Sequence, residues 1–169
     1  MRSHELFKRM SPATAAEVFS YLQKEQKPVY KAAIQGLANQ RNLRGVFIER
    51  KPPNERYPWL QAALSRPISD ALASHLLQGW LLGAHKPMLN DFLDSLGIAH
   101  EEDGTVEELP ASPPKEKIAA AIAHLLAKYP GENVAIYLHA FRDMDSTVQW
   151  PPLNELLDET PELQFAASA

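Results

Sequence analysis

The chain has 169 residues, of which 45% are hydrophobic and 22% are charged, with a formal net charge of −4 and no cysteine. This length and composition predict a soluble globular protein of one domain or two small ones. The lack of cysteine excludes disulfides, thiolate metal ligands and a cysteine nucleophile. We predict a cytoplasmic protein without a membrane span, because the most apolar stretch, residues 72–82, is far shorter than the ~20 residues that cross a bilayer.

Charge is distributed unevenly along the chain. Residues 1–70 hold 12 Lys/Arg against 6 Asp/Glu, whereas residues 71–169 hold 5 against 15. We predict a single compact unit over residues 1–169, with a possible subdivision into a basic helical part, 1–64, and an acidic helical part, 65–169. Opposite fields on one small protein can each select a partner.

Helical spacing dominates the first forty residues. Ser11 followed by Pro12 is a helix start, and apolar residues then recur on one face as far as Leu22. The same spacing returns from Pro28 to Leu37. The two segments are expected to form an antiparallel helix pair.

Residues 41–60 are expected to be a linker or a long loop, because Pro52, Pro53 and Pro58 interrupt them. Val46–Ile48 is either a short strand or the end of a helix, since three residues cannot define a period. Basic residues alternate here with aromatic ones, a combination that can hold a nucleic-acid backbone and stack bases. In the alternative interpretation, the aromatic rings pack in the core and the basic groups only solvate a loop. The candidate interaction residues are Arg41, Arg44, Arg50, Lys51, Arg56 and Tyr57.

The next segment predicts two helices and a turn. A helix that Ser69 can cap and that Gly83 ends has a wide apolar band, so we expect it to be central and Trp80 to be buried. A second helix runs from Pro87 to Leu96 and stops at Gly97. Asp103-Gly104 then favours a tight turn, which predicts a short β-hairpin near residues 98–109.

Apolar spacing predicts three more helices, over 118–129, over 134–144 and from Trp150 onward. Residues 134–141 also have strand propensity, and the tail, 165–169, is expected to fray. The predicted fold is all-α, a compact bundle of about five to seven helices with one short β-hairpin near residues 98–109.

The expected hairpin is strongly acidic, and its carboxylates are a second set of candidate interaction residues. A turn tip flanked by like charges is a hydrated place, which argues against a general acid/base pair, and the spacing is not that of a calcium loop. We interpret the run as a solvated acidic ridge. Its members are Glu101, Glu102, Asp103, Glu107 and Glu108.

The order of elements over residues 68–109 resembles that of winged-helix DNA-binding domains, with two helices, then Leu96-Gly97-Ile98 and a hairpin. The resemblance covers about 40 residues and implies a recognition helix and a wing. However, the expected recognition helix carries Asp91 and Asp94, and the expected wing is acidic as well. Both elements would therefore repel DNA phosphates. A surface of this shape is expected to contact protein.

No motif predicts a catalytic residue, a metal or a cofactor. No serine lies in Gly-x-Ser-x-Gly, the glycines are scattered, and the six histidines include no His-x₃-His pair. His124 and His139 are expected to face solvent, with His139 pairing weakly with Asp143.

The leading hypothesis is a non-enzymatic protein-interaction or assembly protein that binds an unknown protein or a second copy through oppositely charged helical surfaces. A nucleic-acid-binding protein that uses residues 41–59 is the alternative. A small metal-dependent or hydrolytic enzyme is the third hypothesis.

Overall fold

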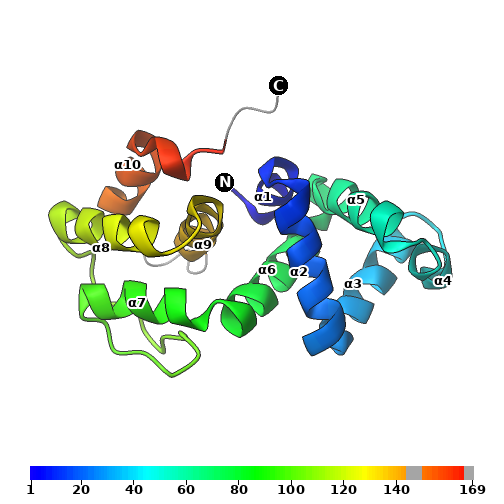
Figure 1. Cartoon of the computed structure of the whole chain (residues 1–169), viewed down its shortest axis with the longest axis horizontal. Coiled ribbons are helices and arrows are strands. Elements are labelled where there is room, and N and C mark those ends of the chain that lie inside the picture. The colour runs from blue at the N-terminus through cyan, green and yellow to red at the C-terminus, as the bar shows by residue number, and fades with distance from the viewer. Residues whose placement is uncertain (144–149, 166–169) are drawn as a thin grey trace. The chain divides into compact units, whose positions relative to one another are not determined.

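The computed structural model describes residues 1–143 and 150–165, and every regular element in them is helical (Figure 1). These residues form ten α-helices and two short 3-10 helices. The predicted all-α class is therefore confirmed. The β-hairpin near residues 98–109 was a wrong prediction, and so was the total of about five to seven helices.

The chain divides into two compact units, Met1–Trp80 and the part that begins at Leu81, and the division falls inside helix α6 (Asp70–Ala84). Charge follows the same division. Residues 71–80 contain no Asp, Glu, Lys or Arg, so the first unit holds the 12 basic and 6 acidic residues of the amino-terminal segment. The sequence of the second unit holds 5 basic and 15 acidic residues.

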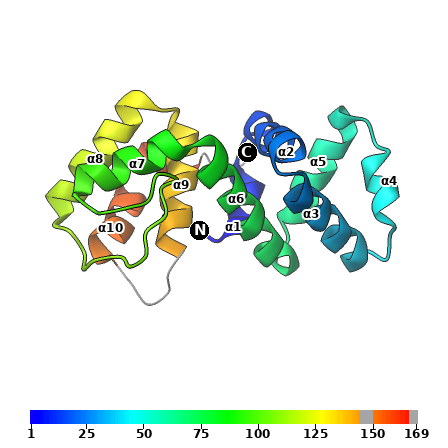
Figure 2. The same cartoon turned by 90° about the horizontal axis from the view of Figure 1, so that it is seen from below.

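The first unit is built from helices whose starts are encoded locally. It contains α1 (Ser3–Arg9), α2 (Pro12–Glu25), α3 (Lys27–Gln40), α4 (Gly45–Glu49), α5 (Pro53–Leu64), the 3-10 helix η1 (Pro67–Ser69) and the first part of α6. The Ser11 hydroxyl accepts a hydrogen bond from the Thr14 amide (3.2 Å), and Pro12 takes the first position of α2. The predicted pairing of α2 with α3 is confirmed, and the two lie side by side in Figures 1 and 2.

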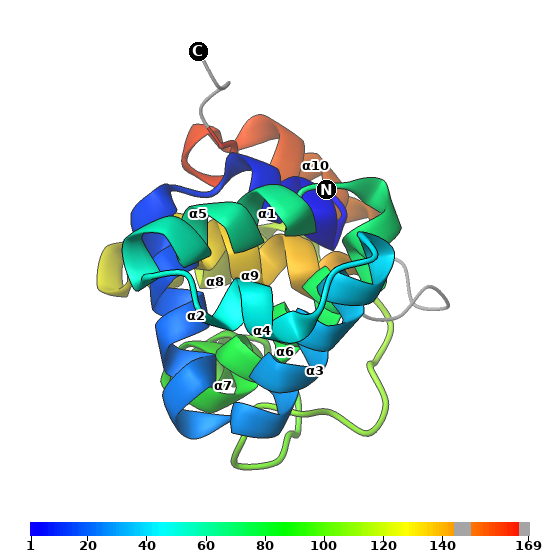
Figure 3. The same ribbon diagram turned by 90° about the vertical axis from the view of Figure 1, so that its right-hand side faces the viewer.

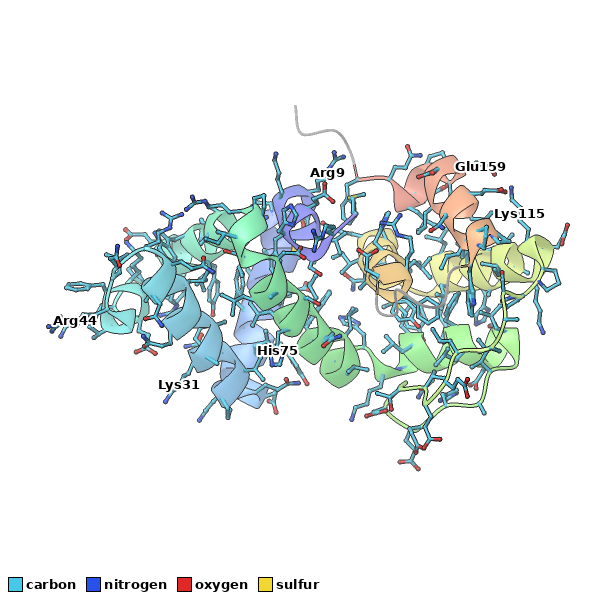
Figure 4. The ribbon with its side chains drawn as sticks, turned by 180° about the vertical axis from the view of Figure 1, so that it is seen from behind. Arg9, Lys31, Arg44, His75, Lys115 and Glu159 are labelled. Atoms are coloured by element: carbon cyan, nitrogen blue, oxygen red, sulfur yellow. The ribbon has the colours of Figure 1, made fainter. Side chains whose placement is uncertain are left out.

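The second unit begins within α6. Its other elements are α7 (Lys86–Leu96), α8 (Lys115–Lys128), α9 (Gly131–Asp143), α10 (Pro151–Glu159) and the 3-10 helix η2 (Pro161–Leu163). The Phe92 ring of α7 meets Tyr137 and Phe141 of α9 edge-on, with centroids 5.6 Å and 5.4 Å away. On the surface, the Lys115 ammonium of α8 lies 3.1 Å from the Glu159 carboxylate of α10 (Figure 4).

Helices α1 and α5 were not predicted, whereas Val46–Ile48, for which strand and helix were both left open, lies in α4. Helices α1 and α4 have 7 and 5 residues, too few to show a helical period. The residues of α5 were expected to be part of a linker because Pro58 lies among them. Pro52 and Pro53 instead serve as the N-cap and first residue of α5, where the missing amide of Pro53 costs no helical hydrogen bond. Residues 41–60 are therefore mostly helical.

The predicted hairpin fails because no main-chain ladder forms around the Asp-Gly turn. The Glu101 amide bonds the Thr105 carbonyl (2.8 Å) and the Gly104 amide bonds the Glu101 carbonyl (3.1 Å), which closes a turn and nothing more. The segment is tied to α7 instead, since the Asn90 side chain donates to the Glu102 carbonyl (3.0 Å). Without a hairpin there is no wing, so the resemblance to winged-helix domains ends with the two helices.

Helix α9 resolves the ambiguity between helix and strand over residues 134–141. All of Asn133–His139 and Phe141 are buried, so the helix has no polar face, which is why its sequence also looks like a strand. The prediction that His139 faces solvent was wrong. Its side chain is buried and bonded to the Leu163 carbonyl (3.1 Å). The predictions for residue 144 and for 166–169 concern residues outside the described ranges.

Trp80 is buried, 1% exposed, as predicted for the apolar band of α6. Helix α6 begins at Asp70, directly after Ser69. Ser69 itself belongs to η1, and its hydroxyl donates to the Ala63 carbonyl (2.9 Å).

Candidate functional site

The short helix α4 and the turn before it expose apolar side chains. Phe47 is 57% exposed, and Leu43 and Val46 are each 41% exposed. Together with Ile68 these are the large hydrophobic side chains of the described residues that lie open to solvent, so three of the four fall within five consecutive residues. Contiguous exposed apolar groups are typical of interaction sites, whereas single ones are ordinary.

Local backbone geometry places this segment on the surface. Helix α3 ends in a turn in which Asn42 is left-handed (φ 53°) and the Leu43 amide bonds the Ala38 carbonyl (2.9 Å). This is a Schellman-type stop, with asparagine in the position that glycine usually takes. The chain then starts α4 at Gly45, and among the residues of that helix only Ile48 is buried. Figure 3 faces α4 and shows it across α3 at the outside of the first unit.

Arginines border the apolar group. Arg44 and Arg50 flank α4 and are exposed, and among the described residues neither has an ion-pair partner; Arg44 is labelled in Figure 4. The Arg41 guanidinium lies 5.3 Å from the centre of the Trp59 ring, within cation–π range. We call this set of residues the α4 surface. It comprises Arg41, Leu43, Arg44, Val46, Phe47 and Arg50.

The α4 surface was predicted in part. Arg41, Arg44 and Arg50 were named from the sequence, whereas Leu43 and Val46 were missed. The sequence did contain a signal for these two residues, because they are apolar and lie within a basic stretch that ends at two prolines. The alternative that Phe47 packs in the core is wrong, because most of its ring is in solvent.

Two of the predicted basic and aromatic candidates, Arg56 and Tyr57, have side-chain donors engaged within the first unit. Arg56 is buried, and its Nη1 donates to the carbonyls of Glu49 (3.0 Å) and Lys51 (3.1 Å), where it fastens the turn between α4 and α5. The Tyr57 hydroxyl donates to the Gln23 side chain (2.9 Å). Lys51 is half-buried beside them.

The acidic candidates lie on the segment 98–109 of the second unit, which we call the acidic loop. Glu101, Glu102, Glu107 and Glu108 are exposed, as expected for a solvated ridge. Asp103 differs, because one of its carboxylate oxygens accepts hydrogen bonds from the Thr105 amide (3.0 Å) and hydroxyl (2.7 Å). These bonds lower the pKa of Asp103 and give it a structural role.

A groove of about 300 Å³ runs along the acidic loop, and its lining residues include Val106 and three of the four exposed glutamates. His100 also lines it. Its Nδ1 lies 2.6 Å from the Glu101 carbonyl and its Nε2 lies 2.7 Å from the Asp94 carboxylate. Both contacts favour the protonated ring and raise the pKa of His100. The lining of the groove therefore combines exposed carboxylates with two small apolar side chains, Ala99 and Val106.

Within residues 1–143 and 150–165, no three side chains of His, Asp or Glu lie close enough to share a metal ion. No helix in the same ranges is long and apolar enough to cross a membrane.

No family model, curated protein or solved structure matches the chain.

Proposed function

We propose that the chain is a non-enzymatic interaction protein that assembles head to tail, with the α4 surface of one copy bound to the acidic loop of another. The observation that carries the proposal is the α4 surface itself: three exposed apolar side chains bordered by three arginines. Apolar contact supplies affinity, and opposite charge supplies selectivity and a faster encounter.

The composition of the α4 surface favours a protein partner over a nucleic acid. Leu43 and Val46 are aliphatic and offer no ring on which a base could stack. Tyr57 is engaged with Gln23, and Trp59 already carries the guanidinium of Arg41. Phe47 is the exposed ring that remains, so single-strand binding would lack a stacking series.

The acidic loop has the matching chemistry. Its exposed glutamates complement the arginines, and Val106 gives the groove an apolar contact for Phe47. Both surfaces belong to the same chain, so a second copy is a partner that is always present. A contact between unlike surfaces of identical chains is heterologous, and it produces rings or filaments according to the rotation between copies.

The first test is sedimentation velocity over a concentration series at low and high salt. We expect oligomers at low salt that dissociate as salt rises, because the Debye length falls from about 10 Å at 0.1 M to about 3 Å at 1 M. Phe47→Ser should weaken the association. Ile68→Ser removes another exposed apolar residue, outside the α4 surface, and should leave it unchanged. A monomer under all conditions would overturn the proposal.

The second test separates head-to-tail contact from any symmetric contact. Arg44→Gln/Arg50→Gln neutralises only the arginines that flank α4, and Glu107→Gln/Glu108→Gln neutralises only glutamates of the acidic loop. Each variant alone should be monomeric, whereas their equimolar mixture should form a dimer, because one copy still has a basic surface and the other an acidic one. No dimer in the mixture would contradict the head-to-tail arrangement.

A binding assay with single-stranded oligonucleotides completes the design. Salt-dependent binding that is lost in Arg44→Glu/Arg50→Glu, in a protein that does not self-associate, would replace the proposed function with nucleic-acid binding.

A further inference from the structure

A second feature of the first unit is a pocket of about 330 Å³ that α2, α3, α4 and α5 line together. This volume lies at the small end of the range for small-molecule sites, ~300–1,000 Å³. Its residues come from distant parts of the sequence, so no local motif marks it. We call it the Arg56 pocket. It is lined by Gln23, Lys27, Tyr30, Lys31, Glu49 and Arg56.

Arg56 brings a buried cation to this pocket. Arg56 is 8% exposed. Its Nη1 donates to the two main-chain carbonyls of the α4–α5 turn, and its Nη2 donates to Gln23 Oε1 (3.3 Å). Its Nε is buried and has no hydrogen-bond partner. A buried donor without a partner costs free energy, which an acceptor in the pocket would recover.

Tyr30 supplies a second buried donor. It is 6% exposed, and the proton of its hydroxyl has no acceptor. Burial raises the pKa of Tyr30, and the nearby Arg56 guanidinium offsets part of that rise. The hydroxyl therefore stays protonated and available to donate.

The remaining charges make the pocket cationic. Lys27 and Lys31 are exposed, lie one turn apart at the start of α3, and add two positive charges to that of Arg56, against one negative charge from Glu49 (Lys31 in Figure 4). Two like charges at this spacing repel each other, and cations are disfavoured at the amino-terminal end of a helix. The first turn of α3 contains no acidic residue to compensate. An anion in the pocket would relieve each of these costs.

We propose that the Arg56 pocket binds the phosphate group of a small molecule, either free phosphate or a small phosphate monoester. Phosphate offers several acceptor oxygens to the guanidinium, the phenol and the two ammonium groups, and its double charge balances the net charge of the lining. A carboxylate offers only two oxygens and a single charge. The inference is independent of self-assembly, because none of the residues that carry it is in the α4 surface.

Isothermal titration with inorganic phosphate, glycerol 3-phosphate and acetate, at constant ionic strength, tests the proposal. Both phosphates should bind and acetate should not. Tighter binding of glycerol 3-phosphate assigns the site to a monoester, and equal or tighter binding of inorganic phosphate assigns it to the free ion. Acetate binding as tight as that of phosphate would overturn the phosphate assignment, and absence of binding by either phosphate would overturn the site.

Variants locate the binding. Tyr30→Phe removes only the hydroxyl, and we expect about tenfold weaker phosphate binding together with an unchanged or higher melting temperature, because an unpaired buried group has been removed. Lys31→Gln should also weaken binding, and Glu49→Gln should strengthen it. Lys8→Gln is the control, an exposed lysine of α1 outside the pocket lining. Phosphate affinity that is the same in Tyr30→Phe and Lys31→Gln as in the native protein would place the anion elsewhere and overturn the proposal.

Discussion

His139 is a neutral histidine held in the interior of the second unit. Its side chain is buried, Nε2 donates to the Leu163 carbonyl (3.1 Å), and Nδ1 is buried without a partner. Burial lowers the pKa of His139 to about 4. The neutral ring therefore links α9 to η2 through this hydrogen bond, and protonation of the ring destabilises the folded state.

This arrangement predicts a loss of stability in mild acid. The unfolded chain binds a proton on His139 near its ordinary pKa of about 6.5, and the folded chain does so only near 4. Stability is therefore complete above about pH 6.5 and falls as the pH decreases toward 4. Between pH 7 and pH 5 we expect a loss of about 2 kcal/mol in the free energy of unfolding.

Urea unfolding at the two pH values measures this loss. His139→Gln keeps a side-chain donor for the Leu163 carbonyl and cannot titrate, so its loss over the same interval should be about 2 kcal/mol smaller. His100 and His85 are present in both proteins and cancel in the comparison. Equal pH dependence in the two proteins would show that His139 is not the titrating group.

The acidic loop contains a glycine at a position where any other side chain would strain the main chain. Gly104 has φ of +86° and is buried. A Cβ at this position would lie 2.7 Å from the Leu89 Cβ, an atom that cannot move without its helix. The turn of the acidic loop thus packs against α7 through the main-chain atoms of Gly104, with no side chain between them.

Gly104→Ala should destabilise the protein by at least ~2 kcal/mol, because the left-handed backbone costs alanine ~1–2 kcal/mol and the contact with Leu89 adds to it. Thermal or urea unfolding measures the change. Gly131→Ala is the matched control: Gly131 starts α9, and an added Cβ meets nothing within 4 Å. It should be neutral or stabilising by up to ~1 kcal/mol. Equal effects of the two substitutions would contradict the packing of the acidic loop on α7.

Elements with a strong local signal could be predicted from the sequence. Ser11-Pro12, Pro87 and Gly97 set helix ends through side-chain and main-chain chemistry within one turn, and the structure places helix ends there. Asp103-Gly104 also makes a turn, but a turn pair cannot specify whether its flanks will pair with each other or pack on a neighbouring helix. That choice was settled by non-local contacts such as Asn90 with Glu102.

The candidate sites show the same limit. Charged residues of the α4 surface and the acidic loop were predicted, because runs of like charge stay on the surface wherever the chain folds. The burial of Arg56 could not be predicted, since it depends on two main-chain carbonyls and on Gln23, which is 33 positions away. The Arg56 pocket could not be predicted for the same reason.

At the scale of the whole molecule, charge is separated rather than mixed. The first unit has 12 basic and 6 acidic residues, and the second has 5 and 15, although the net charge of the chain is only −4. Fields around a protein decay over about 8 Å at physiological ionic strength, so a binding partner responds to the unit it meets rather than to the total charge.

Ion-exchange chromatography tests this separation. At pH 7 and low ionic strength we expect the protein to be retained on a sulfonate resin in spite of its negative net charge, because the basic unit faces the matrix.

Arg44→Gln and Lys117→Gln each remove one positive charge from an exposed side chain, the first from the basic unit and the second from the acidic one. Their net charges are identical, so a response to net charge would make them elute together. We expect Arg44→Gln to elute at lower salt than the native protein and Lys117→Gln to elute unchanged. Passage of the native protein through the resin, or equal shifts of the two variants, would mean that the charges of the two units compensate each other in solution and would remove the electrostatic basis of the proposed assembly.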